Sequence, residues 1–352
     1  MATAPREARP GEARPGEAQP GEAQPGPARV RSLHVAVRVE AAEAPNDTAH
    51  VRVYYPAAPT GSDEERLTGL LPPDRTCGPR PVVIVLPAVN VAADGYRWLA
   101  VALVEAGFVA VTYNHVGELM AGLTGLSPGI DLSALTPDTF GTRPSATAVR
   151  PVLAALRELD ARGTLEGMLD LGHVALGGHS AGGTVALENA DPAWFPGVGA
   201  VFSYGSHTMP VAALGFGAGT VLPVGPVPAM ICAGADDGVI LASADRYGRR
   251  PGEPGHLPVA RTFDEGIRDD LVGYEVVFAG ANHLLVVDPD DPTSARGFLD
   301  PEPTADPVAG RALFAEGLVA FLGRHLLRDS SAGDPREVLG SSTLVASVRR
   351  RG

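Results

Sequence analysis

Short runs of apolar, often β-branched residues alternate with longer stretches of helical spacing through most of this 352-residue chain. Eight short runs are predicted strands: residues 32–39, 50–55, 82–86, 108–113, 174–176, 198–203, 229–233 and 274–278. The first two alternate apolar and polar residues, as an antiparallel hairpin with one solvated face does. The other six are continuously apolar, which is typical of parallel strands covered on both faces. The pattern predicts an α/β fold with a mostly parallel eight-stranded sheet, an antiparallel N-terminal hairpin and helices on both faces.

The intervals between the predicted strands contain predicted helices, and together these elements define the extent of the domain. Helices are predicted over residues 94–106, 145–161, 181–190, 258–269 and 307–327. No linker or domain-sized repeat interrupts these elements, so residues 30–328 are predicted to form one domain. Residues 1–29 repeat proline, glycine, glutamate and alanine, bury almost nothing, and are expected to be a disordered tail. Residues 329–352 are polar and end in three arginines and a glycine, so a flexible C-terminal tail is expected there.

Composition excludes several classes of protein. All 28 basic residues are arginine, so no mechanism that needs a P-loop, Schiff-base or general-base lysine is available. The 41 acidic residues give a net charge of −13 without a basic block, which argues against nucleic-acid or membrane-surface partners. Two cysteines, Cys77 and Cys232, are too few for a disulfide scaffold or a cysteine-rich zinc site. With no signal-peptide core and no apolar stretch of membrane-spanning length, a cytoplasmic location is expected.

One motif in the chain carries chemistry. Residues 178–182 read Gly-His-Ser-Ala-Gly, a G-x-S-x-G pattern between a predicted strand and a predicted helix. A sharp strand-to-helix turn holds the serine in a strained backbone conformation and needs glycines beside it, because a side chain there would collide with neighbouring backbone. The turn places the Ser180 hydroxyl at a helix N-terminus, where the helix dipole favours developing negative charge. The alternative is a Gly/Ser-rich helix start without chemistry.

In this context the chain resembles the α/β-hydrolase superfamily, and the resemblance extends over the whole predicted domain. Within the superfamily, the chain is most similar to one group. Three features carry this similarity: the segment GGHSAGG, the loop LPAV at residues 86–89 and the absence of a long inserted cap. That group comprises dienelactone hydrolases, chlorophyllases and platelet-activating-factor acetylhydrolases, although the cysteine nucleophile of dienelactone hydrolases is replaced here by Ser180. The resemblance implies an α/β-hydrolase fold in which an acid and then a histidine follow the serine.

Sequence order selects the histidine. Three histidines lie beyond a plausible acid: His256, His283 and His325. His256 lies in a Gly/Pro-rich loop, and His325 lies on the terminal predicted helix beside an arginine. His283 follows the last predicted strand and matches the family's histidine loop, so it is the predicted catalytic base.

The acid is expected just after the predicted strand 229–233, where the sequence reads Gly-Ala-Asp-Asp-Gly. Asp237 fits the family's pattern by position, and Asp236 is the alternative. Alternatively, the two carboxylates could serve only to form an Asx turn. In the predicted role, Asp237 accepts the Nδ1 proton of His283 and stabilises the imidazolium that forms when Ser180 is deprotonated.

Acyl transfer also needs two N–H donors around the developing oxyanion. The backbone of Ala181, directly after the nucleophile, is the first predicted donor. The resemblance places the second in the loop after residues 82–86, where Val89 occupies the donor position. Pro87 has no N–H, and Ala88 stands where the family usually has glycine.

Together these features predict a serine hydrolase that cleaves a small-molecule carboxylic ester through an acyl-enzyme, with no cofactor and no metal. His115 and Glu118 are three residues apart but lack a companion cluster, so a loop lining the pocket is expected there rather than metal ligands. Residues 209–228 are expected either to cap the pocket or to be packed core.

Other activities remain open at this stage. An acyltransferase, a lactone-forming enzyme, a C–C hydrolase or a thioesterase would use the same triad, and a non-catalytic scaffold could carry the same fold. Neither the natural substrate nor the oligomeric state follows from the sequence.

Overall fold

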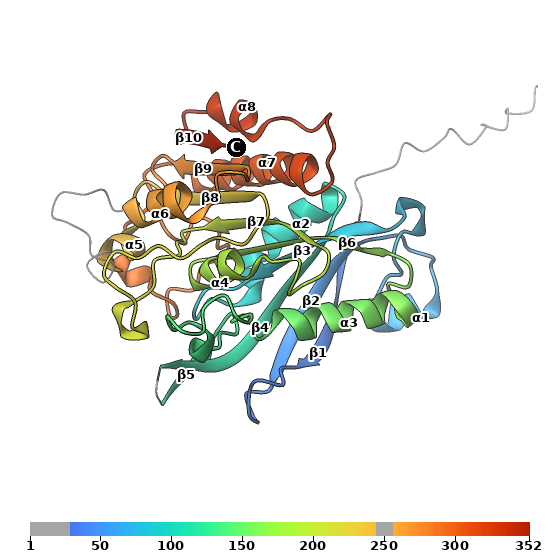
Figure 1. Ribbon diagram of the computed structural model, residues 1–352. Helices are drawn as coiled ribbons and strands as arrows, with labels where there is room; N and C mark the ends of the chain where they lie inside the picture. The colour runs from blue at the N-terminus through green and yellow to red at the C-terminus, as the bar shows by residue number, and fades with distance from the viewer. Residues whose placement is uncertain (1–28, 121, 244–255) are drawn as a thin grey trace, which may run out of the picture.

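The computed structural model describes residues 29–120, 122–243 and 256–352 (Figure 1). All but the last residue of the expected N-terminal tail, residues 1–29, lies outside the described residues. The described part contains a sheet of ten strands: β1 (Arg29–Arg38), β2 (Thr48–Ala57), β3 (Arg80–Leu86), β4 (Val109–Met120), β5 (Leu123–Leu126), β6 (Leu169–His179), β7 (Val198–Tyr204), β8 (Ala229–Gly234), β9 (Gly273–Phe278) and β10 (Val345–Arg351).

The strand order is β1-β2-β4-β3-β6-β7-β8-β9-β10, with β5 paired to β4. Neighbours from β4 to β9 are parallel, whereas β1 with β2, β2 with β4, β4 with β5 and β9 with β10 are antiparallel. The predicted α/β class, the mostly parallel sheet and the antiparallel N-terminal hairpin are therefore confirmed. The predicted strand number is corrected from eight to ten, because the sequence reading missed β5 and β10.

The described helices are α1 (Asp63–Thr68), α2 (Arg97–Glu105), α3 (Val149–Arg162), α4 (Ala181–Asn189), α5 (Gly238–Ser243), α6 (Leu257–Arg261), α7 (Pro307–His325) and α8 (Pro335–Gly340). All five predicted helices have counterparts, and the fourth is split between α6 and a π-helical turn at Thr262–Gly266. The three unpredicted helices are each six residues long, too short to show a helical period. Among the described helices, none combines the length and the apolar character that crossing a bilayer requires.

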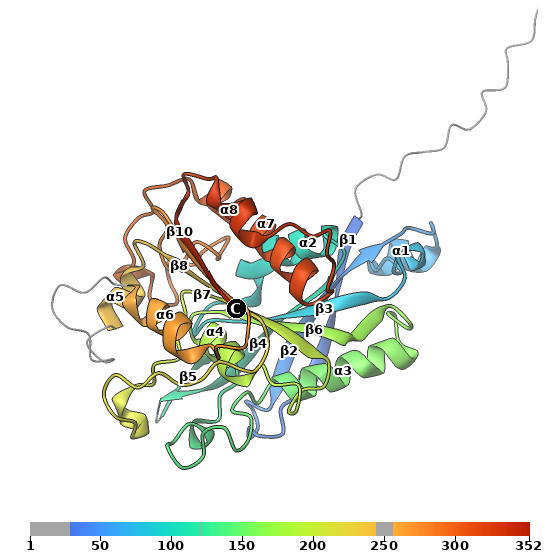
Figure 2. The same ribbon diagram turned by 45° about the horizontal axis from the view of Figure 1, so that its top comes forward.

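Alternate residues of the central strands face two separate hydrophobic clusters. In β3, Val82 and Ile84 pack in the cluster that contains α3, α4 and α6, whereas Val83 and Val85 pack in the cluster that contains α2 and α7. Figure 2 shows these two sets of helices on opposite faces of the sheet. This arrangement explains why the inner strands are apolar at every position, since neither of their faces is solvated.

The strand order reverses at β3, and this reversal positions the candidate site. The chain passes from β3 to β4 on one side of it and then, after α3, to β6 on the other side. In open parallel sheets, such a reversal leaves a crevice outside the carboxyl ends of the strands, where ligands bind. The loop after β3 and the turn after β6 both lie at this crevice.

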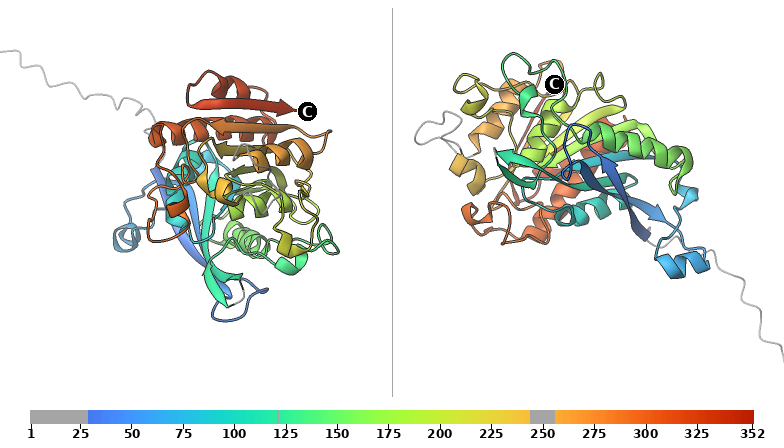
Figure 3. Two further views of the ribbon diagram at one scale, coloured as in Figure 1. Left: turned by 90° about the vertical axis from the view of Figure 1, so that its left-hand side faces the viewer. Right: turned by 90° about the horizontal axis from the view of Figure 1, so that it is seen from below.

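The C-terminal segment is ordered, which corrects the expected flexible tail at residues 329–352. It contains α8 and then β10, which pairs antiparallel with β9 at the sheet edge opposite the N-terminal hairpin (Figure 3). The arginines that suggested a solvated end instead bind carboxylates: Arg349 pairs with the buried Glu275 and, at 2.9 Å, with Asp264, while Arg351 pairs with Asp269. Their partners lie more than 70 residues away in the chain, so the sequence alone does not reveal them.

We expect Arg349→Met to lower the free energy of unfolding, because it leaves the Glu275 carboxylate, whose side chain is 3% exposed, without its ion-pair partner. The expected loss is about 1–3 kcal/mol, below that of a fully buried pair because the Arg349 side chain is 41% exposed. Urea denaturation measures the loss, and adding Glu275→Gln should recover part of it. Unchanged stability in the single variant would contradict an anchoring role for the pair.

Candidate active site

Ser180 lies at the junction of β6 and α4 in a strained backbone conformation. Its φ is +53° and its ψ is −124°, a region that residues with a side chain rarely adopt. Hydrogen bonds on both sides hold it there: its N–H donates to the Tyr204 carbonyl at 3.0 Å, and its own carbonyl accepts from the Ser206 hydroxyl at 2.9 Å. The structure therefore contains the strand-to-helix turn that the motif predicts.

The glycines of the motif are required by close backbone packing. A Cβ on Gly182 would lie 2.3 Å from the Leu86 carbonyl oxygen, and a Cβ on Gly178 would lie 2.5 Å from the backbone of Gly182. Only hydrogen fits at both positions. The close approach seats the start of α4 against the end of β3, next to the loop that carries Val89.

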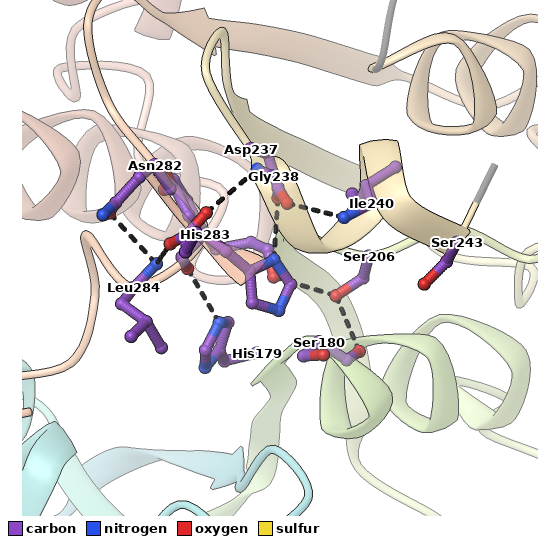
Figure 4. A network of polar contacts seen from close by, with 12 residues as sticks. His179, Ser180, Ser206, Asp237, Gly238, Ile240, Ser243, Asn282, His283 and Leu284 are labelled. Atoms are coloured by element: carbon purple, nitrogen blue, oxygen red, sulfur yellow. Dashed lines mark hydrogen bonds and ion pairs between the residues drawn. The ribbon is translucent and has the colours of Figure 1, made fainter. Parts of the chain in front are cut away.

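His283 and Asp237 form a buried hydrogen-bonded pair. His283 Nδ1 lies 2.7 Å from Asp237 Oδ2, and the side chains are 6% and 1% exposed. Because a carboxylate only accepts, Nδ1 carries the proton and Nε2 is left as the basic nitrogen. Asp237 Oδ1 accepts the Ile240 N–H at 2.8 Å, which fixes the carboxylate. In Figure 4 the His283 ring points toward Ser180.

The other candidates lie elsewhere. The Asp236 side chain is exposed and contacts the Thr304 hydroxyl at 3.4 Å rather than a histidine. His256 precedes α6, and His325 Nε2 lies 3.1 Å from the Tyr274 hydroxyl. Burial, with help from neighbouring arginines, lowers the pKa of His325 to about 4. Of the predicted residues, the structure thus brings together Ser180, His283 and Asp237.

Asp300 joins the loops that carry the acid and the histidine, and the sequence reading missed it. Its Oδ1 accepts the Gly238 N–H at 2.9 Å, and its Oδ2 accepts the Leu284 N–H at 3.0 Å. Burial raises the pKa of Asp300, opposed by backbone hydrogen bonds from His283 and Gly238. Asp300 follows a stretch without strand or helix periodicity, so no sequence signal marks it.

The two predicted oxyanion donors lie on either side of Ser180. Ala181 is the first residue of α4, so its N–H has no acceptor within the helix. In the loop after β3, the Ala88 N–H donates to the Tyr96 hydroxyl at 3.0 Å, and the Asn90 N–H donates to a β5 carbonyl at 2.9 Å. Among the described residues, the N–H of Val89 between them has no such acceptor, and Val89 borders a small cavity shared with Ser180 and His283.

His179, a variable position of the motif, connects this loop to the histidine loop. Its Nε2 donates to the His283 carbonyl at 2.9 Å, so its Nδ1 is the acceptor for the Tyr96 hydroxyl at 3.1 Å. Burial, reinforced by the nearby His283, lowers the pKa of His179 well below its usual value, which keeps the ring neutral. Ala88, Tyr96, His179 and His283 thereby form one chain of hydrogen bonds. The sequence pattern does not reveal this chain of hydrogen bonds, because its residues come from three separate segments.

A cavity of about 200 Å³ opens beside Ser180 and His283. Its wall is mostly apolar and comes from α4, α5, residues 130–135 and residues 209–222. His207, His283 and Arg296 add polar and charged groups to it. The segment 209–228 supplies five of the lining residues, Met209, Pro210, Val211, Leu214 and Leu222, as a pocket wall would. The cavity therefore suits an apolar group placed next to the serine.

One acid interrupts this apolar wall. Glu188, near the end of α4, is only 8% exposed, and its Oε2 has no hydrogen-bond partner among the described residues. Burial alone raises its pKa to about 8. Glu188 is therefore protonated in the native state at neutral pH.

The raised pKa predicts a pH-dependent stability difference between wild type and Glu188→Gln. Between the ordinary pKa near 4.5 and the native value of about 8, the unfolded chain loses the proton that the native state keeps. Wild-type stability therefore falls relative to the non-titrating glutamine variant as pH rises from 5 to 8, by on the order of a few kcal/mol. Urea denaturation of both proteins across this range tests it. A difference that stays constant with pH would show that Glu188 is not a buried neutral acid.

His115 and Glu118 lie on β4 and not in a loop beside the pocket, which corrects that expectation. His115 Nε2 lies 2.9 Å from the Asn46 carbonyl oxygen, and Glu118 is exposed. Neither borders the cavity beside Ser180. Within the described ranges, no three histidine, cysteine or acidic side chains are grouped as metal ligands.

No protein-family model and no curated protein matches this chain.

Proposed function

We propose that this protein is a serine hydrolase of the α/β-hydrolase fold that cleaves a carboxylic ester. The observation that carries the proposal is the buried His283–Asp237 pair, whose ring points toward a serine held at positive φ on a helix N-terminus. A sheet that opens antiparallel and continues parallel, with the serine at the carboxyl end of an inner strand, also supports this fold. The motif favours the dienelactone hydrolase, chlorophyllase and platelet-activating-factor acetylhydrolase group within it.

In the proposed mechanism, the Ser180 hydroxyl attacks the ester carbonyl while His283 Nε2 takes its proton. Asp237 holds the ring in the required tautomer and stabilises the imidazolium. His283 then donates the proton to the leaving alcohol, which gives an acyl-enzyme. A water molecule deprotonated by His283 attacks this intermediate, and the acid is released as Ser180 regains its proton.

The N–H groups of Ala181 and Val89 stabilise the negative charge on the carbonyl oxygen in both tetrahedral intermediates. Each such donor contributes on the order of 10²–10³-fold to the rate in enzymes of this kind. The dipole of α4 adds to their effect because the oxyanion forms at its N-terminus. His179 acts through other groups, since it holds the histidine loop and, through Tyr96, the loop of Val89.

We expect Ser180→Ala to abolish both labelling by a fluorophosphonate probe and hydrolysis of p-nitrophenyl esters, because it removes the only atom that forms the acyl-enzyme. Wild type is expected to label and to turn over these esters. Near-ultraviolet circular dichroism and the melting temperature of the variant check that its fold is intact. Labelling that persists in the variant would assign the nucleophile to another serine, and an unlabelled wild type would contradict the proposed function.

A matched pair of variants tests the acid. Asp237→Asn should lower kcat by about 10³–10⁴-fold, because an amide favours the wrong histidine tautomer. Asp236→Asn makes the same chemical change one residue away on an exposed side chain and should leave kcat within about twofold. Equal losses in the two variants, or a larger loss in Asp236→Asn, would contradict the assignment.

A further inference from the structure

We propose that the cavity beside Ser180 is a subsite for an apolar substrate arm that ends in a hydrogen-bond donor, a hydroxyl or an ammonium group, and that Glu188 is the acceptor. This inference rests on the proposed ester hydrolysis and adds the class of substrate to it. It would make Glu188 a specificity-determining residue rather than a part of the reaction chemistry.

The position of Glu188 on α4 supports this role. Ala181, Thr184, Val185 and Glu188 follow helical spacing, and all four border the cavity, so one face of the helix forms its wall. Glu188 is seven positions after Ala181 in the helix, which places their Cα atoms about 10 Å apart. Helical side chains lean toward the N-terminus, so the carboxyl group of Glu188 is directed back along the wall toward Ser180.

Among the described residues, Oε2 of Glu188 has no partner that would explain its burial. Its neighbour Asn189 shows the contrast: the Asn189 side chain accepts the N–H groups of Ser145 and Ala146 and donates to the Ser145 hydroxyl and the Val185 carbonyl. Asn189 therefore ties two segments together, whereas Oε2 of Glu188 bonds to nothing among the described residues. A buried polar group without a partner is destabilising, and a bound substrate can supply the missing bond.

The chemistry of a carboxyl group in an apolar wall selects the group that it binds. A carboxyl oxygen accepts hydrogen bonds whether the acid is ionised or not. A hydroxyl or ammonium end group can therefore satisfy it, whereas a methyl end group leaves it unpaired. A carboxylate end group has no proton to donate. It can only share the proton of Glu188, and the pair then brings a net negative charge into a mostly apolar wall.

The test uses esters whose arm ends in methyl, hydroxyl, ammonium or carboxylate at equal length. One set carries the arm on the acyl side of p-nitrophenyl esters, and a second carries it on the alcohol side of acetate esters. The arms run from roughly three to eight carbons, because the helical distance of about 10 Å is an upper limit on the span to a carboxyl group that leans back toward Ser180. The quantity measured is the ratio of kcat/KM for each end group to that for methyl, in wild type, Glu188→Gln, Glu188→Met and Glu316→Gln.

In wild type, one of the two sets should give a ratio of at least about tenfold for hydroxyl or ammonium over methyl. Glu188→Met should bring that ratio to one or below. A bound ammonium group favours the ionised form of Glu188, which an amide cannot reach. Glu188→Gln keeps an acceptor oxygen, so it should retain preference for hydroxyl and lose preference for ammonium. These two variants thus tell the two end groups apart. Glu316 is an exposed acid on α7, and Glu316→Gln should behave as wild type.

Melting temperature adds a readout that does not depend on turnover. Glu188→Met should melt at least as high as wild type, because it replaces an unpaired buried acid with an apolar side chain. A lower melting temperature together with unchanged end-group ratios would assign Glu188 a structural role and overturn the proposal. A wild-type preference for methyl or carboxylate in both sets would overturn it as well. In either case, probe labelling at Ser180 and hydrolysis of the methyl-ended esters would still support the proposed function, whereas their absence would contradict that function itself.

Discussion

The contact between Gly182 and the end of β3 is the constraint on which the site depends. A Cβ at Gly182 would fall 2.3 Å from the Leu86 carbonyl oxygen, so α4 can begin where it does only because that position has no side chain. The strain at Ser180, with φ at +53°, is held by this contact and by the hydrogen bonds of its backbone to β7 and Ser206. Once α4 is seated, the hydroxyl of Ser180 and the N–H of Ala181 are both directed to the crevice at the strand reversal. The strained conformation of Ser180 persists because the parallel strands on either side hold the backbone in it.

Hydrogen bonds between loops, rather than the reacting groups themselves, set the remaining geometry. Asp300 binds the N–H groups of Gly238 and Leu284, and so holds the acid loop and the histidine loop at a fixed separation. His179 links the histidine loop to Tyr96, which in turn binds the loop after β3. The bonds of His179 and Tyr96 are buried and those of Asp300 are partly buried, so they are stronger than they would be in water. A buried polar network of this kind restricts the orientation of the His283 ring and of the Val89 N–H at the same time.

The sequence predicted those features whose signal is local. Inner strands are apolar at every position, and the turn at Ser180 lies within five residues, so both could be found by pattern. The order acid and then histidine came from the resemblance, and the structure brings Asp237 and His283 together, with Asp236 turned to solvent. β10 was missed because its arginines suggest a solvated end, and their carboxylate partners are distant in the chain. Asp300 and His179 were missed for the same physical reason: a hydrogen bond between distant segments leaves no periodic trace in either one.

α4 begins directly after the candidate nucleophile Ser180 and carries Glu188, the unpaired acid of the pocket. The distance from Ser180 to Glu188 is the length of a rigid helix, so it does not change when loops move. The width of the cavity depends instead on residues 209–222, which form a segment with little regular structure. In the proposed subsite, α4 would therefore set the length and end group of the substrate arm, and a separate part of the chain would set its bulk. Under that proposal, substitutions in 209–222 would alter the preference for bulk and not that for the end group, because they leave the spacing along α4 unchanged.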